Sequence, residues 1–341
     1  MANLGLKERY DFQQWIIKDL KEKNGYSQRD AAQYNPRLAM DEELLWDFLM
    51  ETQEETMDYL LKKLSKETII TLINKEIVKG GFLFALKEGV FIENKQLRLL
   101  YRKPATSFNE KAVQQYKANR LSVIEEVVYE EGGRIDLVIF INGLALFAIE
   151  LKFNPSGQSV QDAIKQLKGR NPNNRLFRFE QGVLASFAVD TMEIYMTTQL
   201  KSQETYFLPF NMGKGEGIDM GSGNPHNPNG VDTEYLWLDV LTKDSILQLI
   251  ESFIFFELDK NDAKKRTLIF PRYHQRRAVS RLLEDMKVNH TDSNYLIQHS
   301  AGSGKTNTIA WLAHSLVSLH DDQNRNIVDT VLIVTDRIVV D

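Results

Sequence analysis

The chain has 341 residues, of which 43% are hydrophobic and 26% charged, an ordinary composition for a globular protein long enough for two domains. Its formal net charge of −5 excludes a general polyanion binder, so any contact with DNA must come from a local basic patch. The lack of cysteine excludes disulfides and cysteine-ligated zinc. The sequence has no signal peptide and no apolar run of membrane-spanning length, so we expect a cytoplasmic protein without membrane contact.

Residues 11–76 are predicted to be helical. Apolar residues recur at helical spacing from Phe12 to Leu20, and this first helix should end before residues 24–25. Asp41 is placed to cap a second helix, and a third amphipathic run follows. β-Branched and aromatic residues then predict strands at residues 95–101 and 123–129.

Residues 132–152, GGRIDLVIFINGLALFAIELK, predict two strands, 135–141 and 144–152, joined by an Asn142-Gly143 turn. Both strands are apolar on both faces, which is typical of strands inside a covered sheet. Asp136, Glu150 and Lys152 nevertheless lie in these strands. Because isolated charges are costly to bury, they need a partner, and a divalent cation suits this set.

The spacing of the two carboxylates makes a testable demand on the hairpin. A regular two-residue turn pairs position 136 with position 149 and puts Asp136 and Glu150 on opposite faces. A three-residue turn or a β-bulge shifts the pairing by one residue and brings both to the same face. We therefore expect an odd-length turn or a bulge, and a regular two-residue hairpin would count against a shared metal site.

Two carboxylates that hold Mg²⁺ beside a lysine suit phosphodiester hydrolysis. The metal neutralises the phosphate and activates a water, while the ammonium orients that water or stabilises the developing charge. The spacing Asp136-x13-Glu150-x-Lys152 resembles the core of the restriction-endonuclease-like, PD-(D/E)xK, superfamily. That resemblance implies an α/β fold with a mixed sheet flanked by helices. The alternative is a surface ion cluster around Lys152 that holds no metal.

A helix is predicted at about residues 159–168, and residues 165–178 are basic without an acidic residue. This run is either a solvated face or a surface for phosphate-backbone contact, and we give the two equal weight. Because related nucleases often carry a glutamine on this helix, we expect Gln166 to support the site. Strands at 183–189 and 193–198 should extend the sheet. The candidates for DNA contact are Lys165, Lys168, Arg170, Arg175 and Arg178.

Residues 211–232 contain six glycines and two prolines and predict a long loop. An amphipathic, strongly apolar helix is predicted at residues 244–258. The charged run 259–266 that follows is interpreted as a domain boundary. We therefore divide the chain into an endonuclease domain, 1–258, and a second domain, 259–341.

The second domain carries a nucleotide-binding pattern. Residues 295–300 predict a short strand, and a glycine turn and a helix at 307–319 follow it. In a phosphate loop the backbone N–H groups and the helix N-terminus cradle the phosphates, the lysine reaches them and the hydroxyl binds Mg²⁺. The strict form has glycine where this chain has His299. We predict ATP binding through Gly302, Ser303, Gly304, Lys305 and Thr306.

Residues 270–275 resemble the adenine-reading Q motif of superfamily 2 helicases, with Gln275 placed to read the base. Residues 331–335 predict the next strand, and Asp336-Arg337 resembles the start of helicase motif Ia. A RecA-like motor also needs an acidic Walker B strand and a partner domain with an arginine finger, which this sequence lacks. We expect residues 259–341 to be the first part of a RecA-like domain, the chain to be the N-terminal fragment of a longer motor protein, and ATP hydrolysis by it to be inefficient.

A nuclease core followed by a helicase phosphate loop resembles the restriction (R, HsdR) subunit of type I restriction-modification enzymes. The resemblance covers nearly the whole chain and includes residues 99–101, 119–121, 141–144, 149–152, 187–190, 207–211 and 299–306. It implies that Asp136 and Glu150 ligate Mg²⁺ with the Leu151 carbonyl, and that Lys152 is the catalytic lysine. It also implies a complete subunit that joins methyltransferase (M) and specificity (S) subunits, translocates double-stranded DNA using ATP and cuts it away from the recognition site when translocation stalls.

Two positions depart from the family's pattern. Phe12 is followed by Gln13 and Gln14, where the family often has an acid, and Gln166 is followed by Leu167, where the family usually has tyrosine. Two alternatives to an active nuclease remain. One is a translocase with a degenerate nuclease that only grips DNA; the other is a scaffold whose helix 244–258 and glycine-rich loop dock the methyltransferase complex.

Overall fold

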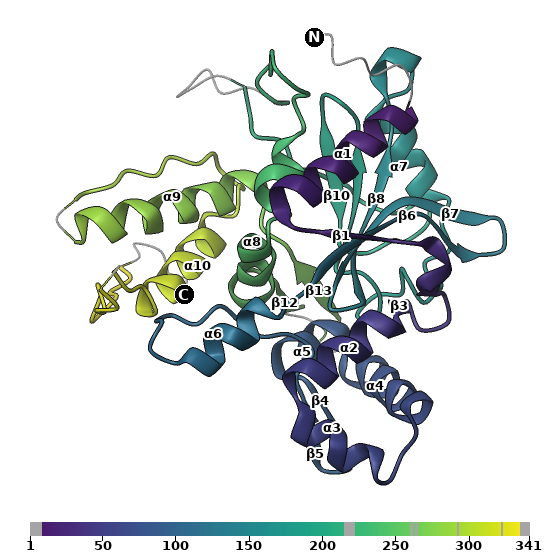
Figure 1. Cartoon of the computed structure of the whole chain (residues 1–341). Helices are drawn as coiled ribbons and strands as arrows, with labels where there is room; N and C mark the ends of the chain where they lie inside the picture. Colours follow the sequence, from purple (N-terminus) through teal and green to yellow (C-terminus); the bar gives the residue numbers. More distant parts are fainter. Residues whose placement is uncertain are drawn as a thin grey trace.

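The computed structural model describes residues 9–214, 222–259, 262, 265–291, 293–321 and 323–334. A mixed sheet lies at its centre (Figure 1). β1 and β6 run parallel, as do β8 and β9, and the other neighbours run antiparallel. The mixed sheet predicted from the sequence is therefore present. Its strands, in spatial order, are β1 (Ser27–Arg29), β6 (Leu121–Glu130), β7 (Gly133–Ile141), β8 (Leu144–Leu151), β9 (Ala185–Val189), β10 (Ile194–Thr197) and β11 (Leu208–Pro209), with β3 (Met40–Asp41) joining β8 to β2 (Tyr34–Asn35).

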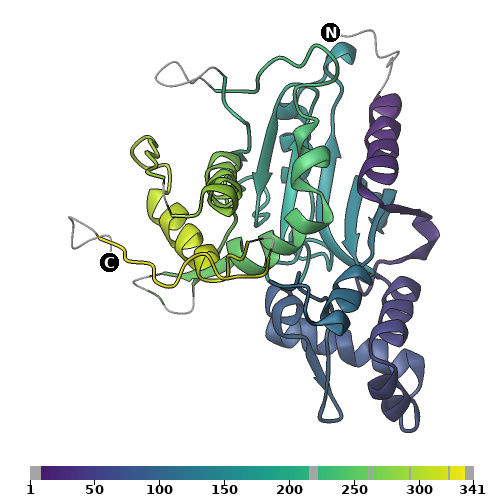
Figure 2. The ribbon, with the colours of Figure 1, turned by 60° about the vertical axis from the view of Figure 1, so that its left-hand side comes forward.

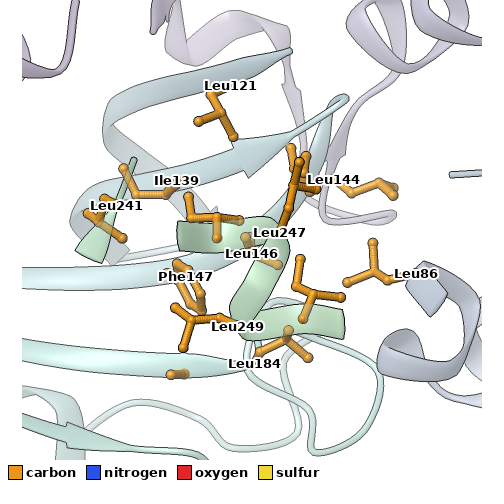
Figure 3. Close-up of a cluster of buried hydrophobic side chains, with 14 of the residues drawn as sticks. Leu86, Leu121, Ile139, Leu144, Leu146, Phe147, Leu184, Leu241, Leu247 and Leu249 are labelled. Carbon is orange, nitrogen blue, oxygen red and sulfur yellow. The ribbon is translucent and has the colours of Figure 1, made fainter. Parts of the chain in front are cut away.

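Helices cover both faces of this sheet. On one face α7 (Val160–Lys168) packs on β8 and β9, and its Leu167 joins Val138 and Phe140 in a buried cluster. The other face is covered by α1 (Arg9–Asn24), α8 (Lys243–Gln248) and two π-helical turns, η4 (Leu236–Val240) and η5 (Leu249–Phe253). Figure 3 shows part of this second layer, where Leu247 and Leu249 lie close to Phe147 of β8. The covered sheet agrees with strands that are apolar on both faces.

The N-terminal part forms the predicted helices. α1 ends at Asn24, and Asp41 caps α2 (Glu42–Thr52) by accepting a hydrogen bond from the Leu44 N–H at 3.0 Å. The strand predicted at 95–101 is shorter, because only β5 (Lys95–Leu97) pairs with β4 (Val90–Ile92). The remaining helices of this region are α3 (Glu54–Leu61), α4 (Lys66–Gly80), α5 (Phe82–Glu88) and α6 (Glu110–Lys117), with a short 3-10 turn at η1 (Ala31–Gln33). A second 3-10 turn, η2 (Asn154–Ser156), follows β8.

The helix predicted at 244–258 is confirmed as far as Phe253 and wrong over residues 254–258. α8 and η5 end at Phe253, and the next residues form β12 (Phe255–Leu258), which pairs antiparallel with β13 (Arg266–Ile269). Adjacent aromatic residues favour a strand once a partner is available, and that partner lies beyond the stretch that suggested a helix. The predicted boundary between residues 258 and 259 therefore falls inside a hairpin whose strands pair across it.

The C-terminal part contributes α9 (Tyr273–Asn289) and α10 (Lys305–Val317), which pack on each other beside the sheet (Figures 1 and 2). The strands predicted at 295–300 and 331–335 do not form at the positions that the structure describes, namely 295–300 and 331–334. Apart from the half-buried Val331, their apolar side chains are exposed, since no neighbouring strand pairs with them there. Thr335 and the motif at 336–337 lie outside the described residues. Within the described part of the chain, no helix has the length and apolar character needed to cross a bilayer.

Candidate functional site

The β7–β8 hairpin contains the bulge that the carboxylate spacing demands. A two-residue turn pairs Ile141 with Leu144, and Asn142 and Gly143 both have positive φ, of 50° and 81°. Phe140 pairs with Ala145, but the next pair is Ile139 with Phe147, so Leu146 is an extra residue on β8. Further along, the last pair of the ladder is Leu137 with Ile149, and extending this register by one residue sets Asp136 level with Glu150. The prediction of a bulge is confirmed, and the two carboxylates share a face.

Both carboxylates are buried and fully engaged. Asp136 is 5% exposed and Glu150 is 0% exposed. The Leu151 N–H donates to Asp136 Oδ2 at 2.7 Å, which brings the Leu151 peptide to this carboxylate. Burial, and then the negative charge of Asp136, raises the pKa of Glu150 to about 7. Burial and the neighbouring acid both disfavour the charged form of Glu150, so a cation bound beside this carboxylate would stabilise it.

Lys152 lies between Glu150 and α7. Its Nζ is 3.4 Å from Glu150 Oε1 and donates to Gln166 Oε1 at 2.7 Å. Its backbone N–H donates to Val189 O at 2.8 Å, so β9 fixes the strand at this point. The buried ammonium therefore has a defined position, and Gln166 makes the contact with the site that was expected of it.

The N-terminus of α1 supplies contacts that sequence reasoning missed. Arg9 donates through Nη1 to Asp136 and through Nη2 to Glu126 Oε1. Glu126 has a φ of 51° inside β6, which is strained for a glutamate, and it also pairs with Arg134 at 2.7 Å. Nothing in the spacing of Arg9 or Glu126 pointed to these roles, since they meet Asp136 only through the fold.

The two glutamines that replace the family's acid on the first helix also have defined partners. The side-chain amides of Gln13 and Gln14 both donate to Glu125 Oε2, at 2.8 and 2.6 Å. An acidic side chain of β6, Glu125, is therefore the common partner of the two glutamines.

The basic run after β8 divides into inward and outward side chains. Arg170 turns into the site, where Nη2 donates to Glu150 Oε2 at 2.9 Å and Nη1 to the Tyr129 hydroxyl at 3.1 Å. Arg175 donates to Asn74 and to the Gln181 carbonyl, and burial lowers its pKa to about 10. These internal contacts do not support Arg170 and Arg175 as external DNA contacts. Lys165 and Arg178 are exposed and Lys168 is half-buried, so these three remain candidates.

The arginine that reaches Glu150 could not be identified from helical spacing. α7 ends at Lys168, so Arg170 lies beyond the helix that carries Gln166 and turns toward Glu150 from the segment that follows it.

A cavity opens onto Asp136 and Lys152. Its volume is about 480 Å³, and Arg9, Asp136, Lys152, Gln166 and Arg170 are among its lining residues. A second cavity of about 530 Å³ adjoins it and shares Gly132, Gly133, Gln166 and Arg170. Asp136 is therefore reached from a cavity lined by basic and amide side chains, which suits an anionic ligand. The adjoining cavity is partly lined by the acidic residues Glu130, Glu131 and Asp162.

The donor set suits a hard divalent cation in part. Asp136 and Glu150 bring two carboxylates close together, with the Leu151 N–H bound to Asp136. Mg²⁺ is bound by one or two carboxylates together with waters and substrate oxygens. Within the described residues, no group of three or more histidine, cysteine or acidic side chains is arranged to hold a metal. A cation bound here would have the carboxylates of Asp136 and Glu150 as ligands. It would either displace the Arg9 guanidinium from Asp136 or share that carboxylate with it.

The predicted nucleotide-binding residues also lie together. Gly302 and Gly304 have φ of 72° and 81°, and α10 begins at Lys305. Lys305 Nζ donates to the carbonyls of His299 and Ser300 at 3.3 and 3.0 Å. The Gln275 amide, from α9, donates to the Gly304 carbonyl at 2.9 Å, so two motifs separated by a predicted strand meet. Ser303 is buried and Thr306 is exposed.

Comparison with known proteins matches two parts of the chain to two family models. Residues 6–205 match the family model described as type I restriction enzyme R protein N terminus, and residues 268–341 match the model described as type III restriction enzyme, res subunit. Two curated relatives from Methanocaldococcus jannaschii are similar. The putative type I restriction enzyme MjaVIIIP endonuclease subunit is 25% identical over 93% of this chain and 29% of its own length. The putative MjaIXP endonuclease subunit is 22% identical over 90% of this chain and 31% of its own length.

The chain thus spans about three-tenths of the length of these relatives. The first family model alone covers more than half of the chain. The chain belongs to the family of type I restriction enzyme R proteins, whose N-terminal region it matches.

Proposed function

We propose that this chain carries the Mg²⁺-dependent DNA endonuclease site of a type I restriction R subunit, on a restriction-endonuclease-like, PD-(D/E)xK, fold. The observation that supports this most is the Leu146 bulge, which puts Asp136 and Glu150 on one face beside Lys152. A strand pair built only for packing has no need of that irregularity, which buries two carboxylates together.

The proposed chemistry is hydrolysis of a phosphodiester bond. Mg²⁺ held by Asp136, Glu150 and the Leu151 carbonyl would neutralise the phosphate and lower the pKa of a water. Lys152, fixed by Gln166, is placed to hold that water or to stabilise charge that develops on the phosphate. Arg9 and Arg170 line the cavity through which a phosphodiester would approach.

We assign ATP to the Gly302–Thr306 loop as the second ligand. The match of residues 268–341 to a restriction-enzyme res subunit and the contact of Gln275 with Gly304 support this assignment. In the complete protein, ATP hydrolysis would drive translocation along double-stranded DNA, and M and S subunits would supply recognition and methylation. Lys165, Lys168 and Arg178 are the basic residues that we propose for contact with the DNA backbone.

Metal binding and cleavage test the nuclease assignment directly. We expect Asp136→Asn and Glu150→Gln to abolish Mg²⁺ binding in calorimetric titrations and to abolish Mg²⁺-dependent DNA cleavage by the complete protein. The matched control is Glu131→Gln, which removes an exposed acid from the adjoining cavity and should change neither. Metal binding that survives in both variants would contradict the assignment, and a wild-type protein that binds DNA without cleaving it would favour the degenerate, DNA-gripping alternative.

A further inference from the structure

The first turn of α9 contacts two different parts of the molecule. Gln275 is 4% exposed and ties the helix to the phosphate loop: its Oε1 accepts from the Arg272 N–H, and its Nε2 donates to the Gly304 carbonyl, each at 2.9 Å. The next residue, Arg276, turns away from that loop toward Asp239. Because adjacent helical residues point about 100° apart, a rotation of α9 that disturbs one contact also disturbs the other.

Arg276 and Asp239 form a bidentate ion pair. Arg276 Nη1 donates to Asp239 Oδ2 at 2.7 Å, and Nη2 donates to Asp239 Oδ1 at 2.8 Å. The Arg276 side chain is 7% exposed and that of Asp239 is 47% exposed. A parallel fork of this kind fixes the direction of the guanidinium as well as its position.

Asp239, which accepts both hydrogen bonds, belongs to the predicted endonuclease domain, residues 1–258, which we call the nuclease body. Asp239 lies in η4, a π-helical turn, and π-helical turns are rare and frequently mark functional positions. Two residues earlier, Trp237 is 1% exposed, packs against Phe12 and Trp15 of α1, and donates from Nε1 to Asp19 at 3.0 Å. The Asp239 carboxylate that pairs with α9 therefore lies in a turn packed into the same core as the β7–β8 site.

Aromatic packing fixes the start of the same helix. Phe270 lies 6.0 Å from the rings of Phe147, Phe187 and Phe210, and Tyr273 lies 4.7 Å from the ring of Tyr235. These contacts set where the helix begins, whereas the Arg276 fork sets its rotation. Gly304 has a positive φ and immediately precedes Lys305. The hydrogen bond from Gln275 to the Gly304 carbonyl therefore constrains the backbone next to Lys305.

We infer that Asp239 is a positioning residue for the nucleotide site: the nuclease body, through Arg276 and Gln275, holds the phosphate loop in its binding conformation. This inference rests on the proposed assignment of ATP to the Gly302–Thr306 loop. It goes beyond that assignment by naming a residue outside the motor motifs on which nucleotide affinity depends.

The test is a titration of the complete protein with a fluorescent ATP analogue. Asp239→Asn keeps the shape of the side chain and removes its charge, and it should weaken binding by roughly two- to thirtyfold, the range observed for mutations that couple to a site without touching the ligand. Asp239→Glu keeps the carboxylate and should restore most of the affinity. Lys305→Ala should lose binding, and thermal melting should show that each variant remains folded.

The matched control is Glu180→Gln. It removes the ion pair between Arg266 of β13 and Glu180, which joins the same two parts of the molecule but does not involve α9. Its affinity should equal that of the wild type. The inference would be overturned if Asp239→Asn bound the analogue as tightly as the wild type, or if Glu180→Gln lost as much affinity as Asp239→Asn. Either result would leave the proposed nucleotide site itself unaffected. A wild-type protein that shows no Lys305-dependent binding would overturn the proposed nucleotide site and the inference with it.

Discussion

Strand β8 and residues 295–297 are both short apolar stretches next to a chemical motif, yet their surroundings are opposite. Phe147 of β8 is 0% exposed, and neighbouring strands pair with β8 along both edges. Leu296 is 92% exposed, and residues 295–300 have no strand assignment. α10, which follows directly, is helical all the same. A helix closes its hydrogen bonds within its own segment, whereas a strand needs a neighbour, so apolar composition alone does not make a strand.

The largest effect that this contrast predicts is on stability at the sheet. Phe147→Ala should lower the free energy of unfolding by about 3–5 kcal/mol, because it removes a ring packed against Phe187 and Phe270 and leaves a cavity. Denaturant unfolding followed by circular dichroism measures it. A loss below about 1 kcal/mol would mean that Phe270 and its neighbours collapse into the space, which would contradict the rigid docking of α9 on the sheet.

Much of the hairpin could be predicted because its constraints are local or obey period two. The Asn142-Gly143 turn, two-sided apolar strands and the spacing from Asp136 to Glu150 together required a bulge, although its position at Leu146 was not determined. Arg9 and Glu126 could not be predicted, because they reach Asp136 from α1 and β6 through tertiary packing. The same limit explains the missed β12–β13 pair, whose partner strand lies outside the window that suggested a helix.

The next effect concerns the buried acid. Because the pKa of Glu150 is raised from 4.5 to about 7, the folded chain binds this proton more tightly than the unfolded chain does. Without divalent cations, the free energy of unfolding should fall as pH rises from 4.5 to 7, by up to roughly 3 kcal/mol. Glu150→Gln should remove this fall and Glu131→Gln should retain it. Parallel pH profiles for wild type and Glu150→Gln would contradict the raised pKa.

A smaller effect is expected one contact away from the carboxylates. Gln166→Ala removes the 2.7 Å partner of Lys152 and should slow single-turnover DNA cleavage by about tenfold, since misplaced catalytic groups lose orientation without losing charge. Gln166→Glu, which keeps an oxygen acceptor at that distance, should retain more activity than the alanine variant. An unchanged cleavage rate in Gln166→Ala would show that Lys152 needs no help from α7.

The smallest effect is expected in the exposed stretch, residues 295–297. Leu296→Ala should change the free energy of unfolding of this chain by less than about 0.5 kcal/mol, because the side chain is almost fully exposed. Denaturant unfolding of Leu296→Ala and Phe147→Ala side by side gives the contrast in one experiment. A loss at Leu296 comparable to that at Phe147 would mean that residues 295–297 are buried in solution.

We propose that the β7–β8 hairpin cuts DNA and that the phosphate-loop segment serves a separate, nucleotide-dependent step. Lys152→Ala in the complete protein, assembled with its M and S subunits, tests this most directly when DNA cleavage and ATP hydrolysis are followed together. We expect cleavage to fall by at least about a hundredfold, as when one preorganised charge-stabilising group is removed, while ATP hydrolysis is retained. Undiminished cleavage in this variant would contradict the nuclease assignment.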